Sequence, residues 1–209
     1  MTLATAERGT RTQAQRRDRT RTALLESAAR GLSRHGYGNL VLEQVARDAG
    51  YTRGALYHLF ANKEDLALAV VAWVRQTWNE EVGQVAAAAT DPADALIALA
   101  RGHAVYCRRD VARVMMTLRV EFSGQDHPVA RAVKQGVATL LADCTRLITT
   151  GRRSGAIPPG PPPRLVALAY LGAVEGLVIN LAGEAPFDEA LVESAVRGVL
   201  GLSPAHPQP

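Results

Sequence analysis

The stretch that decides the fold is residues 45–65, VARDAGYTRGALYHLFANKED. Apolar residues at helical spacing lead into it: Leu42, Val45, Ala46 and Ala49. They predict a short amphipathic helix, which Gly50 ends because glycine adopts the left-handed conformation without steric cost. The Thr52 hydroxyl can cap a second helix over residues 53–59. Two short helices joined by a tight glycine turn predict a helix-turn-helix, whose second helix enters a DNA major groove.

The same residues carry a longer pattern, Ala-Gly-hydrophobic-Ser/Thr-x-Gly-x-Leu-Tyr-x-His-Phe-x-x-Lys-x-x-Leu. The matching positions are Ala49, Gly50, Thr52, Gly54, Leu56, Tyr57, Phe60, Lys63 and Leu66. The stretch resembles the DNA-binding motif of the tetracycline-repressor-like (TetR) transcriptional regulators. This resemblance is specific over residues 20–66. The alternative is a three-helix packing unit without a role on DNA.

Two departures from the pattern alter the expected contacts with DNA. Leu40 and Val41 stand where the family usually has threonines, so a helix cap and a phosphate contact are missing there. Asn39 is the substitute we expect for the cap. Leu59 stands where the family usually has histidine, which removes another phosphate donor.

No strand-like alternation occurs, so we expect an all-α fold with an N-terminal three-helix head, a C-terminal helical body and about nine helices. The expected helices cover residues 20–35, 42–49, 53–59, 62 to beyond 78, 91 to beyond 106, 111–122, 127–150, 163–182 and 188–200. The proline- and glycine-rich run over residues 151–163 reads as a loop.

We divide the chain into four parts. They are a flexible basic arm (1–17), a helix-turn-helix DNA-binding domain (18–62), a helical ligand-binding and dimerisation domain (63–203) and a tail (204–209). The 209 residues are enough for one large domain or two small ones with a hydrophobic core.

The positive charge is concentrated at the N-terminal end. Residues 1–65 hold 11 basic and 7 acidic side chains, a net charge of +4, whereas residues 66–209 hold 13 of each. A localised basic segment is what phosphate neutralisation requires. A solvated basic tail gives the same count, so the charge supports a role on DNA without deciding it.

The exposed face of the second helix and the resemblance together give a set of DNA-binding residues. They are Arg19, Arg21, Gln44, Thr52, Arg53, Gly54, Ala55, Tyr57, His58 and Lys63. Arg53 is placed to reach a base edge, and Lys63 to meet a phosphate at a helix start. The arm either follows the double-stranded DNA, along its backbone or into a minor groove, or is a solubilising tail.

In the family, the last two long helices form a four-helix dimer interface, so the resemblance implies a homodimer here. The residues it implies are Leu165, Leu168, Gly172, Gly176, Leu191, Ala195, Val196 and Val199. Two heads one helical turn apart read a palindrome, which gives dimerisation a physical purpose.

A small-molecule effector site is the second feature that the resemblance implies. Its candidate residues are Trp73, Trp78, His103, Tyr106, Met115, Met116, Arg119, Phe122, Tyr170, Glu175 and Asn180. Apolar walls with a few polar groups suit a small-molecule pocket, although each residue taken singly also suits core packing. The carboxylate of Glu175 on an apolar helix needs a partner, either Arg119, Arg146 or a cationic ligand.

We therefore expect a transcriptional repressor that a small apolar or amphipathic effector releases from a palindromic operator. The alternatives are an effector-free architectural DNA-binding protein of the same fold and an α-helical enzyme. The sequence contains no catalytic loop motif and no metal-spaced set of His and Cys, so we expect no enzyme activity, no cofactor and no metal.

Three observations favour a cytoplasmic protein without a membrane partner. Cys107 and Cys144 lie far apart and suit reduced core thiols. The most apolar segment, residues 165–182, contains Glu175 and Asn180, which favours a buried helix over a membrane span. The N-terminus has no apolar run of the kind that a secretory signal carries.

Overall fold

The computed structural model describes residues 3–181, 185 and 187–204, with side chains from residue 13 onward. Every regular element in these residues is helical, which confirms the all-α prediction. The chain forms two compact units: Met1–Trp73 with Arg113–Ala132, and Val74–Ala112 with Val133–Pro209.

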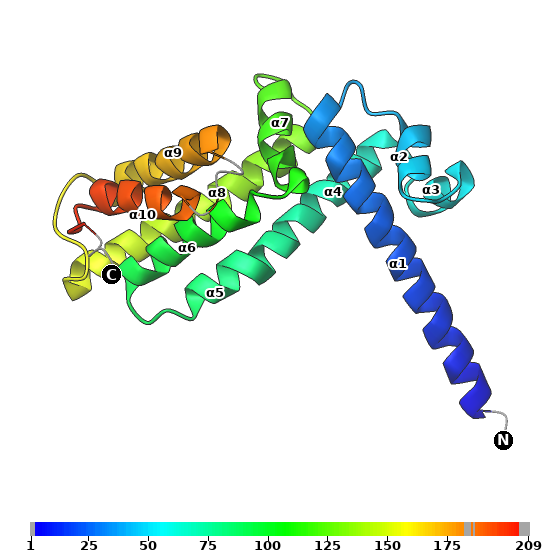
Figure 1. Ribbon diagram of the computed structural model, residues 1–209, viewed down its shortest axis with the longest axis horizontal. Coiled ribbons are helices and arrows are strands. Elements are labelled where there is room, and N and C mark those ends of the chain that lie inside the picture. Colours follow the sequence, from blue (N-terminus) through cyan, green and yellow to red (C-terminus); the bar gives the residue numbers. More distant parts are fainter. Residues whose placement is uncertain (1–2, 182–184, 186, 205–209) are drawn as a thin grey trace. The chain divides into compact units, whose positions relative to one another are not determined.

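The first unit is a helical head. It contains α1 (Leu3–His35), α2 (Leu42–Asp48), α3 (Arg53–Leu59), the first part of α4 (Lys63–Trp78), α7 (Val114–Glu121) and the start of α8 (Pro128–Ser154). Helix α2 packs against both α1 and α3, and α7 also packs against α1 (Figure 1). The unit therefore extends beyond the predicted domain over residues 18–62.

Helix α1 is longer than the sequence predicted. It begins at Leu3, whereas we expected an arm without regular structure up to residue 17 and a helix from Thr20. The added segment has no proline and is rich in Ala, Arg and Gln, which all favour helix. Apolar periodicity reports burial rather than helicity, so it did not detect this helical extension, which is exposed over residues 13–19.

The helix-turn-helix turn has the predicted geometry. Gly50 ends α2 with φ of 77°, in the left-handed region. The Tyr51 N–H donates to the Ala46 carbonyl at 2.9 Å, which completes a Schellman motif. The Thr52 hydroxyl then caps α3 by accepting from the Ala55 N–H at 3.2 Å.

The loop before α2 differs from the prediction. Gly36 ends α1 with φ of 75°, and its N–H donates to the Leu32 carbonyl at 3.0 Å. Helix α2 starts after Val41 without a side-chain cap. The amide of Asn39, the expected cap, donates to the His35 carbonyl at 3.1 Å, so it satisfies the end of α1 instead.

A carboxylate from α7 fixes this loop. Glu121 accepts the Tyr37 N–H at 2.5 Å and the Gly38 N–H at 2.7 Å. The Tyr37 ring packs on Phe122 and His127, with ring centroids 5.1 and 5.3 Å apart. The corner between α7 and α8 therefore belongs with the head, although 84 residues separate Tyr37 from Glu121.

The buried core of the first unit draws on each of its helices. Its members include Leu24, Leu25, Ala28, Ala29, Leu32, Val45, Ala46, Leu56, Phe60, Leu66, Val70, Leu118 and Val129. The apolar face predicted for the first helix of the helix-turn-helix is therefore confirmed as a core face, with Leu42, Val45 and Ala46 buried.

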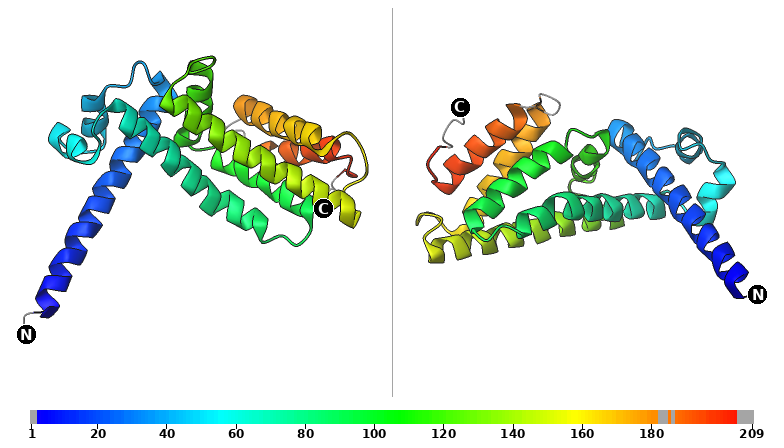
Figure 2. Two further views of the ribbon diagram at one scale, coloured as in Figure 1. Left: turned by 180° about the vertical axis from the view of Figure 1, so that it is seen from behind. Right: turned by 60° about the horizontal axis from the view of Figure 1, so that its bottom comes forward.

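The second unit is the helical body. It contains the rest of α4, a π-helical turn η1 (Asn79–Gly83), α5 (Gln84–Ala87), α6 (Pro92–Tyr106), the rest of α8, α9 (Pro163–Leu181) and α10 (Phe187–Leu200). Helix α10 packs against both α6 and α9 (Figure 2). Their shared core includes Leu96, Ala100, Cys144, Ile148, Ala167, Tyr170, Val192 and Val196.

Some helix boundaries differ from the prediction. The sequence did not predict η1 and α5, which continue directly from α4. The helix expected over residues 111–122 opens with a 3-10 turn, η2 (Asp110–Arg113). Helix α8 runs on to Ser154, so the loop begins later than residue 151. The expected helix end at Ala182 and the tail over 205–209 lie outside the described residues.

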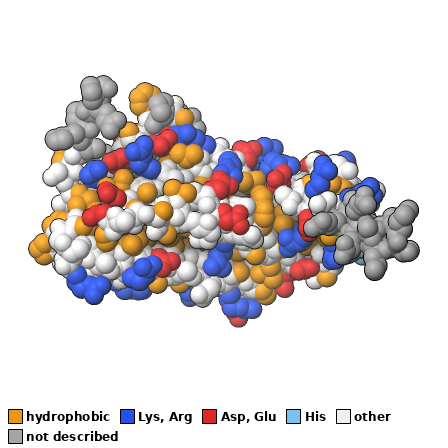
Figure 3. Space-filling view, turned by 90° about the horizontal axis from the view of Figure 1, so that it is seen from below, with side chains coloured by type: hydrophobic (Ala, Val, Ile, Leu, Met, Phe, Trp, Pro, Cys, Tyr) orange, Lys and Arg blue, Asp and Glu red, His pale blue; other side chains and the backbone are white. Residues whose placement is uncertain are grey.

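Several charged side chains of the second unit form ion pairs. Basic side chains of α6 and the turn after it meet acidic ones in the pairs Arg101–Glu193, Arg108–Asp188 and Arg109–Glu81. On the face drawn in Figure 3, side chains of both signs are interspersed with hydrophobic ones. This pairing is consistent with the zero net charge of residues 66–209.

Candidate DNA interface and effector cavity

Helix α3 has one anchored face and one open face. Leu56 and Phe60 are 0% and 2% exposed and hold the helix to the core. The open face carries the exposed residues Thr52, Arg53, Gly54, Tyr57 and His58, with Ala55 half-buried beside them. The structure thus places six of the predicted DNA-binding residues on or beside one short surface.

Arg53 is held between two neighbours on this surface. Its Nε lies 3.1 Å from Oε1 of Glu43, which belongs to α2. Its guanidinium carbon lies 5.2 Å from the centroid of the Tyr57 ring, within the range of a cation–π contact. The first residue of the recognition helix therefore has a defined orientation before any DNA is bound.

Lys63 occupies the start of α4, where a phosphate contact was predicted. Its ammonium donates to the Gly38 carbonyl at 2.8 Å and lies 4.9 Å from the Tyr37 ring centroid. Asn62 caps this helix by accepting the Asp65 N–H at 2.9 Å. Lys63 thus ties α4 to the loop between α1 and α2, and its phosphate contact stays a prediction.

The two predicted arginines of α1 are exposed. Arg19 projects from the exposed segment before the core, and the guanidinium carbon of Arg21 lies 5.7 Å from the Phe60 ring centroid. Arg16 and Arg17, one turn earlier, are exposed as well. The helical form of this segment places these charges on a regular surface next to the head's core.

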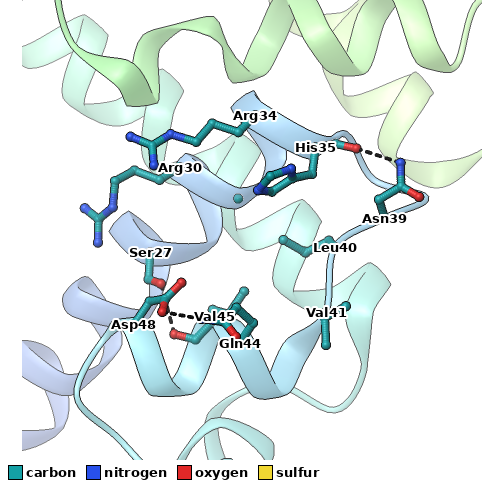
Figure 4. A pocket seen from close by; sticks show the side chains of 11 residues that line it. Ser27, Arg30, Arg34, His35, Asn39, Leu40, Val41, Gln44, Val45 and Asp48 are labelled. Atoms are coloured by element: carbon teal, nitrogen blue, oxygen red, sulfur yellow. Dashed lines mark hydrogen bonds between the residues drawn. The ribbon is translucent and has the colours of Figure 1, made fainter.

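Gln44 lies at a cleft of about 370 Å³ between α1 and α2. Figure 4 shows Arg30 and Arg34 extending from α1 on one side of it, and the Gln44 amide donating to Asp48 at 2.5 Å on the other. Ser27 of α1 also lines the cleft, and its hydroxyl donates to the Val45 carbonyl of α2 at 2.9 Å.

Residues 24–70 match the model of the family described as bacterial regulatory proteins, tetR family. The chain is therefore similar to this family over its helix-turn-helix segment. The HTH-type transcriptional repressor BepR of Brucella suis biovar 1 (strain 1330) is 28% identical over 176 residues, which cover 81% of this chain and 84% of that protein.

Two solved structures show that the likeness in fold extends over both units of the chain. AibR in complex with isovaleryl coenzyme A and operator DNA superposes with a TM-score of 0.73 at 20% identity, covering 88% of this chain and 100% of that one. FadR from Bacillus subtilis in complex with stearoyl-CoA gives 0.72 at 18% identity, covering 88% and 99%.

The second unit contains a small cavity of about 30 Å³, roughly the volume of one water molecule. Its lining residues are Trp78, Leu99, His103, Leu140, Cys144, Tyr170, Leu171, Val174 and Glu175. Four predicted effector-site residues thus meet from three helices: Trp78, His103, Tyr170 and Glu175. The Tyr170 hydroxyl donates to the Leu96 carbonyl at 2.6 Å, which fixes its ring as a wall.

The other predicted effector-site residues do not line this cavity. Trp73, Met115, Met116, Arg119 and Phe122 belong to the first unit. Tyr106 is buried with its hydroxyl 2.8 Å from that of Thr77, and Asn180 is exposed and donates to the Gly176 carbonyl of its own helix. They were chosen by residue type, which does not say which unit a side chain joins. Arg146, a possible Glu175 partner, pairs with Asp143.

His103 is held neutral in this cavity. Trp78 Nε1–H donates to His103 Nδ1 at 3.0 Å, so the proton of the neutral ring is on Nε2, which lies 3.4 Å from Cys107 Sγ. Burial lowers the pKa of His103 to about 4, against an opposing effect of the Glu175 carboxylate. Cys144 is a buried thiol on the same wall, and burial raises its pKa to about 12.

We expect His103 to make the body less stable in acid. Its folded pKa of about 4 is below the ordinary 6.5, so the unfolded chain binds more protons as the pH falls. Stability present above pH 6.5 is lost progressively down to pH 4, by at most about 3 kcal/mol. Chemical denaturation across this range should show the loss in the wild type and not in His103→Gln. If the free energy of unfolding depended on pH in His103→Gln as it does in the wild type, the assignment of this loss to His103 would be contradicted.

Within the part of the chain that the structure describes, the last two helices leave an apolar face uncovered. Exposed fractions are 56% for Leu165, 46% for Leu168, 54% for Ile179 and 46% for Leu191, and Gly172 is exposed between them. By length and composition alone, residues 163–180 could cross a membrane. Only 28% of that window is buried, so the expectation of a buried helix was wrong for the single chain.

One predicted interface residue is not available to a partner. Val196 is 0% exposed and belongs to the core of the second unit. Ala195 and Val199 are half-buried beside it, and Gly176 is half-buried on α9. On a short amphipathic helix, the side that packs inward cannot be told from the side that meets a partner by spacing alone.

Sequence reasoning missed two acidic residues that shape the DNA-binding head. Glu43 contacts Arg53, and Glu121 holds the loop before α2. The sequence did carry a signal for Glu43, because an acidic side chain on a surface that binds phosphate needs a cationic partner. Glu121 gave no signal, since its partners are backbone N–H groups far away in the sequence.

Proposed function

We propose that this chain is a homodimeric repressor that binds a palindromic operator in double-stranded DNA in the cytoplasm and is released by a small amphipathic effector. The observation that carries the proposal is the open face of α3, with Arg53, Tyr57 and His58 exposed on a capped helix in a tetR-family domain. Side chains in this position on a recognition helix reach base edges and flanking phosphates.

The relatives support the same reading. BepR is named a transcriptional repressor, and AibR was crystallised on operator DNA. The uncovered apolar face of α9 and α10 supplies the surface for a second copy. A dimer brings two heads to two half-sites, which one short recognition helix needs for a specific site.

Selection from random duplexes tests the DNA-binding proposal. The wild-type chain should enrich a palindrome with half-sites about one helical turn, or a multiple of it, apart. Enrichment of an asymmetric single site would argue against the dimer. Enrichment of no sequence at all would favour the alternative of an architectural DNA-binding protein.

We expect Arg53→Ala to relax base preference and to cost about 1–3 kcal/mol on the selected operator. Tyr57→Phe and Lys63→Ala should instead weaken operator and random duplex by the same factor, because phosphate contacts carry no sequence information. Fluorescence anisotropy on both duplexes separates these patterns. If Arg53→Ala weakened both duplexes equally, Arg53 would be reassigned to the DNA backbone.

The effector proposal rests on the side chains that line the cavity in the body. At about 30 Å³ this cavity must widen to admit a small molecule, since ligand pockets usually measure about 300–1,000 Å³. Trp78, Tyr170 and apolar side chains form its walls, while His103 and Glu175 add polar groups. AibR and FadR were crystallised with acyl-coenzyme A thioesters, which are amphipathic. An effector acts only through a difference in affinity between DNA-bound and free states, typically about 1–3 kcal/mol.

Reciprocity provides the effector test. Compounds that quench Trp78 fluorescence should weaken operator binding by about 5- to 150-fold, and operator should weaken their binding by the same factor. Acyl-coenzyme A thioesters and simple amphiphiles are the first compounds to screen. A tight binder that leaves operator affinity unchanged is not the effector, and a screen without release would favour the effector-free alternative.

A further inference from the structure

The surface that presents Arg53 also carries a carboxylate. Glu43 sits in the first turn of α2, and its Oε1 lies 3.1 Å from Nε of Arg53 at the start of α3. Both side chains are open to solvent, at 67% for Arg53 and 42% for Glu43. An acid beside DNA phosphates weakens binding to every sequence, so its presence here calls for a compensating gain.

We propose that Glu43 is a positioning residue that sets base specificity by holding the Arg53 guanidinium in its reading orientation. This inference rests on the proposed DNA-binding function. It adds to that function a residue that sets specificity through Arg53 and does not itself contact DNA.

The geometry leaves Arg53 ready for a base. Glu43 occupies Nε, so the N–H groups on Nη1 and Nη2 stay available for a guanine edge. The Tyr57 ring lies 5.2 Å from the guanidinium carbon and restricts it from a second side. A long side chain fixed by two neighbours loses less conformational freedom on binding than a free one, which is the advantage of preorganisation.

Stability of the fold does not account for this pair. Exposed ion pairs contribute little to stability, because water and salt screen them. The electrostatic effect and the positioning effect also have opposite signs on DNA. Removing the charge raises affinity for any duplex, whereas losing the orientation lowers discrimination between the right base and the wrong ones.

The test is Glu43→Gln in the full-length chain. Affinities are measured for the selected operator and for operators changed at the base pair where Arg53→Ala abolishes preference. We expect discrimination at that base pair to fall about tenfold, as expected for weakening one bidentate contact, with random-duplex affinity unchanged or higher. In the Arg53→Ala background, Glu43→Gln should change no base preference.

Glu26→Gln is the matched control. Glu26 is an exposed carboxylate of α1 in the same unit, and it is not among the predicted DNA-binding residues. The substitution removes the same charge and should leave discrimination intact. If Glu43→Gln only raised all affinities equally, or if Glu26→Gln lowered discrimination as much, the positioning role would be refuted. A wild-type chain that enriches no motif would instead refute the proposed DNA-binding function.

Discussion

We expect the wild type to be a dimer at micromolar concentration and the double variant Leu168→Glu/Leu191→Glu to be a folded monomer. Both side chains are 46% exposed, on the face of α9 and α10 that no other described residue of the chain covers. Facing like charges across a two-fold interface oppose association, while neither site is part of the monomer core. Light scattering measures the mass directly.

Operator affinity should fall in this variant, because dimerisation is lost. Two linked heads gain roughly 100- to 10,000-fold over one, and the monomer loses this gain without losing any contact to DNA. Val85→Glu is the control, because Val85 is 64% exposed on α5, away from this face. Val196→Glu should unfold the chain, since it places a charge in the core. A Leu168→Glu/Leu191→Glu chain that stays dimeric would place the interface elsewhere.

The second large effect is expected at Glu121, in the head. Its carboxylate accepts two backbone N–H groups, from Tyr37 and Gly38, at 2.5 and 2.7 Å. Glu121→Ala leaves both donors without a protein partner, and we expect a loss of about 2 kcal/mol in the free energy of unfolding. Urea denaturation followed by far-ultraviolet circular dichroism measures it.

Asp126→Ala serves as the control for Glu121→Ala. Asp126 is an acid of the same corner whose side chain is 88% exposed and pairs with Arg131. It should change stability by only a few tenths of a kcal/mol, as exposed pairs do. Equal, small effects of both substitutions would show that the loop does not depend on α7.

The helix-turn-helix could be predicted from the sequence because its signals are local. Gly50 and Thr52 specify a turn through backbone conformation and one short hydrogen bond, and both effects involve neighbours in the sequence. The exposed face of α3 followed from helical spacing in the same way. Local rules of this kind act before tertiary packing and survive it.

The surroundings of the DNA-binding residues were not predictable by the same means. Lys63 meets the carbonyl of Gly38, 25 residues away, and Tyr37 meets Glu121 from 84 residues away. Such contacts depend on how helices pack, and residue type alone does not specify them. Asn39 was mispredicted for a different reason. It does bind a helix end, as its residue type suggested, but that end is the C-terminus of α1 and not the start of α2.

The effector site shows the same limit. Aromatic and polar residues on apolar helices suggested eleven candidates, and the structure gathers Trp78, His103, Tyr170 and Glu175 around one cavity. A residue such as Phe122 has the right chemistry but stacks on His127 in the other unit, at 4.4 Å between ring centroids. Spacing along one helix cannot show which faces converge from several helices.

Sequence-specific DNA binding is the central claim, and one titration tests it most directly. The wild-type chain is titrated with the selected operator and with a shuffled duplex of equal length, between about 50 and 200 mM salt. We predict that affinity for both duplexes falls steeply with salt, while the operator is bound at least about 1,000-fold more tightly throughout. Equal affinity for the two duplexes, or affinity that does not change with salt, would contradict the claim.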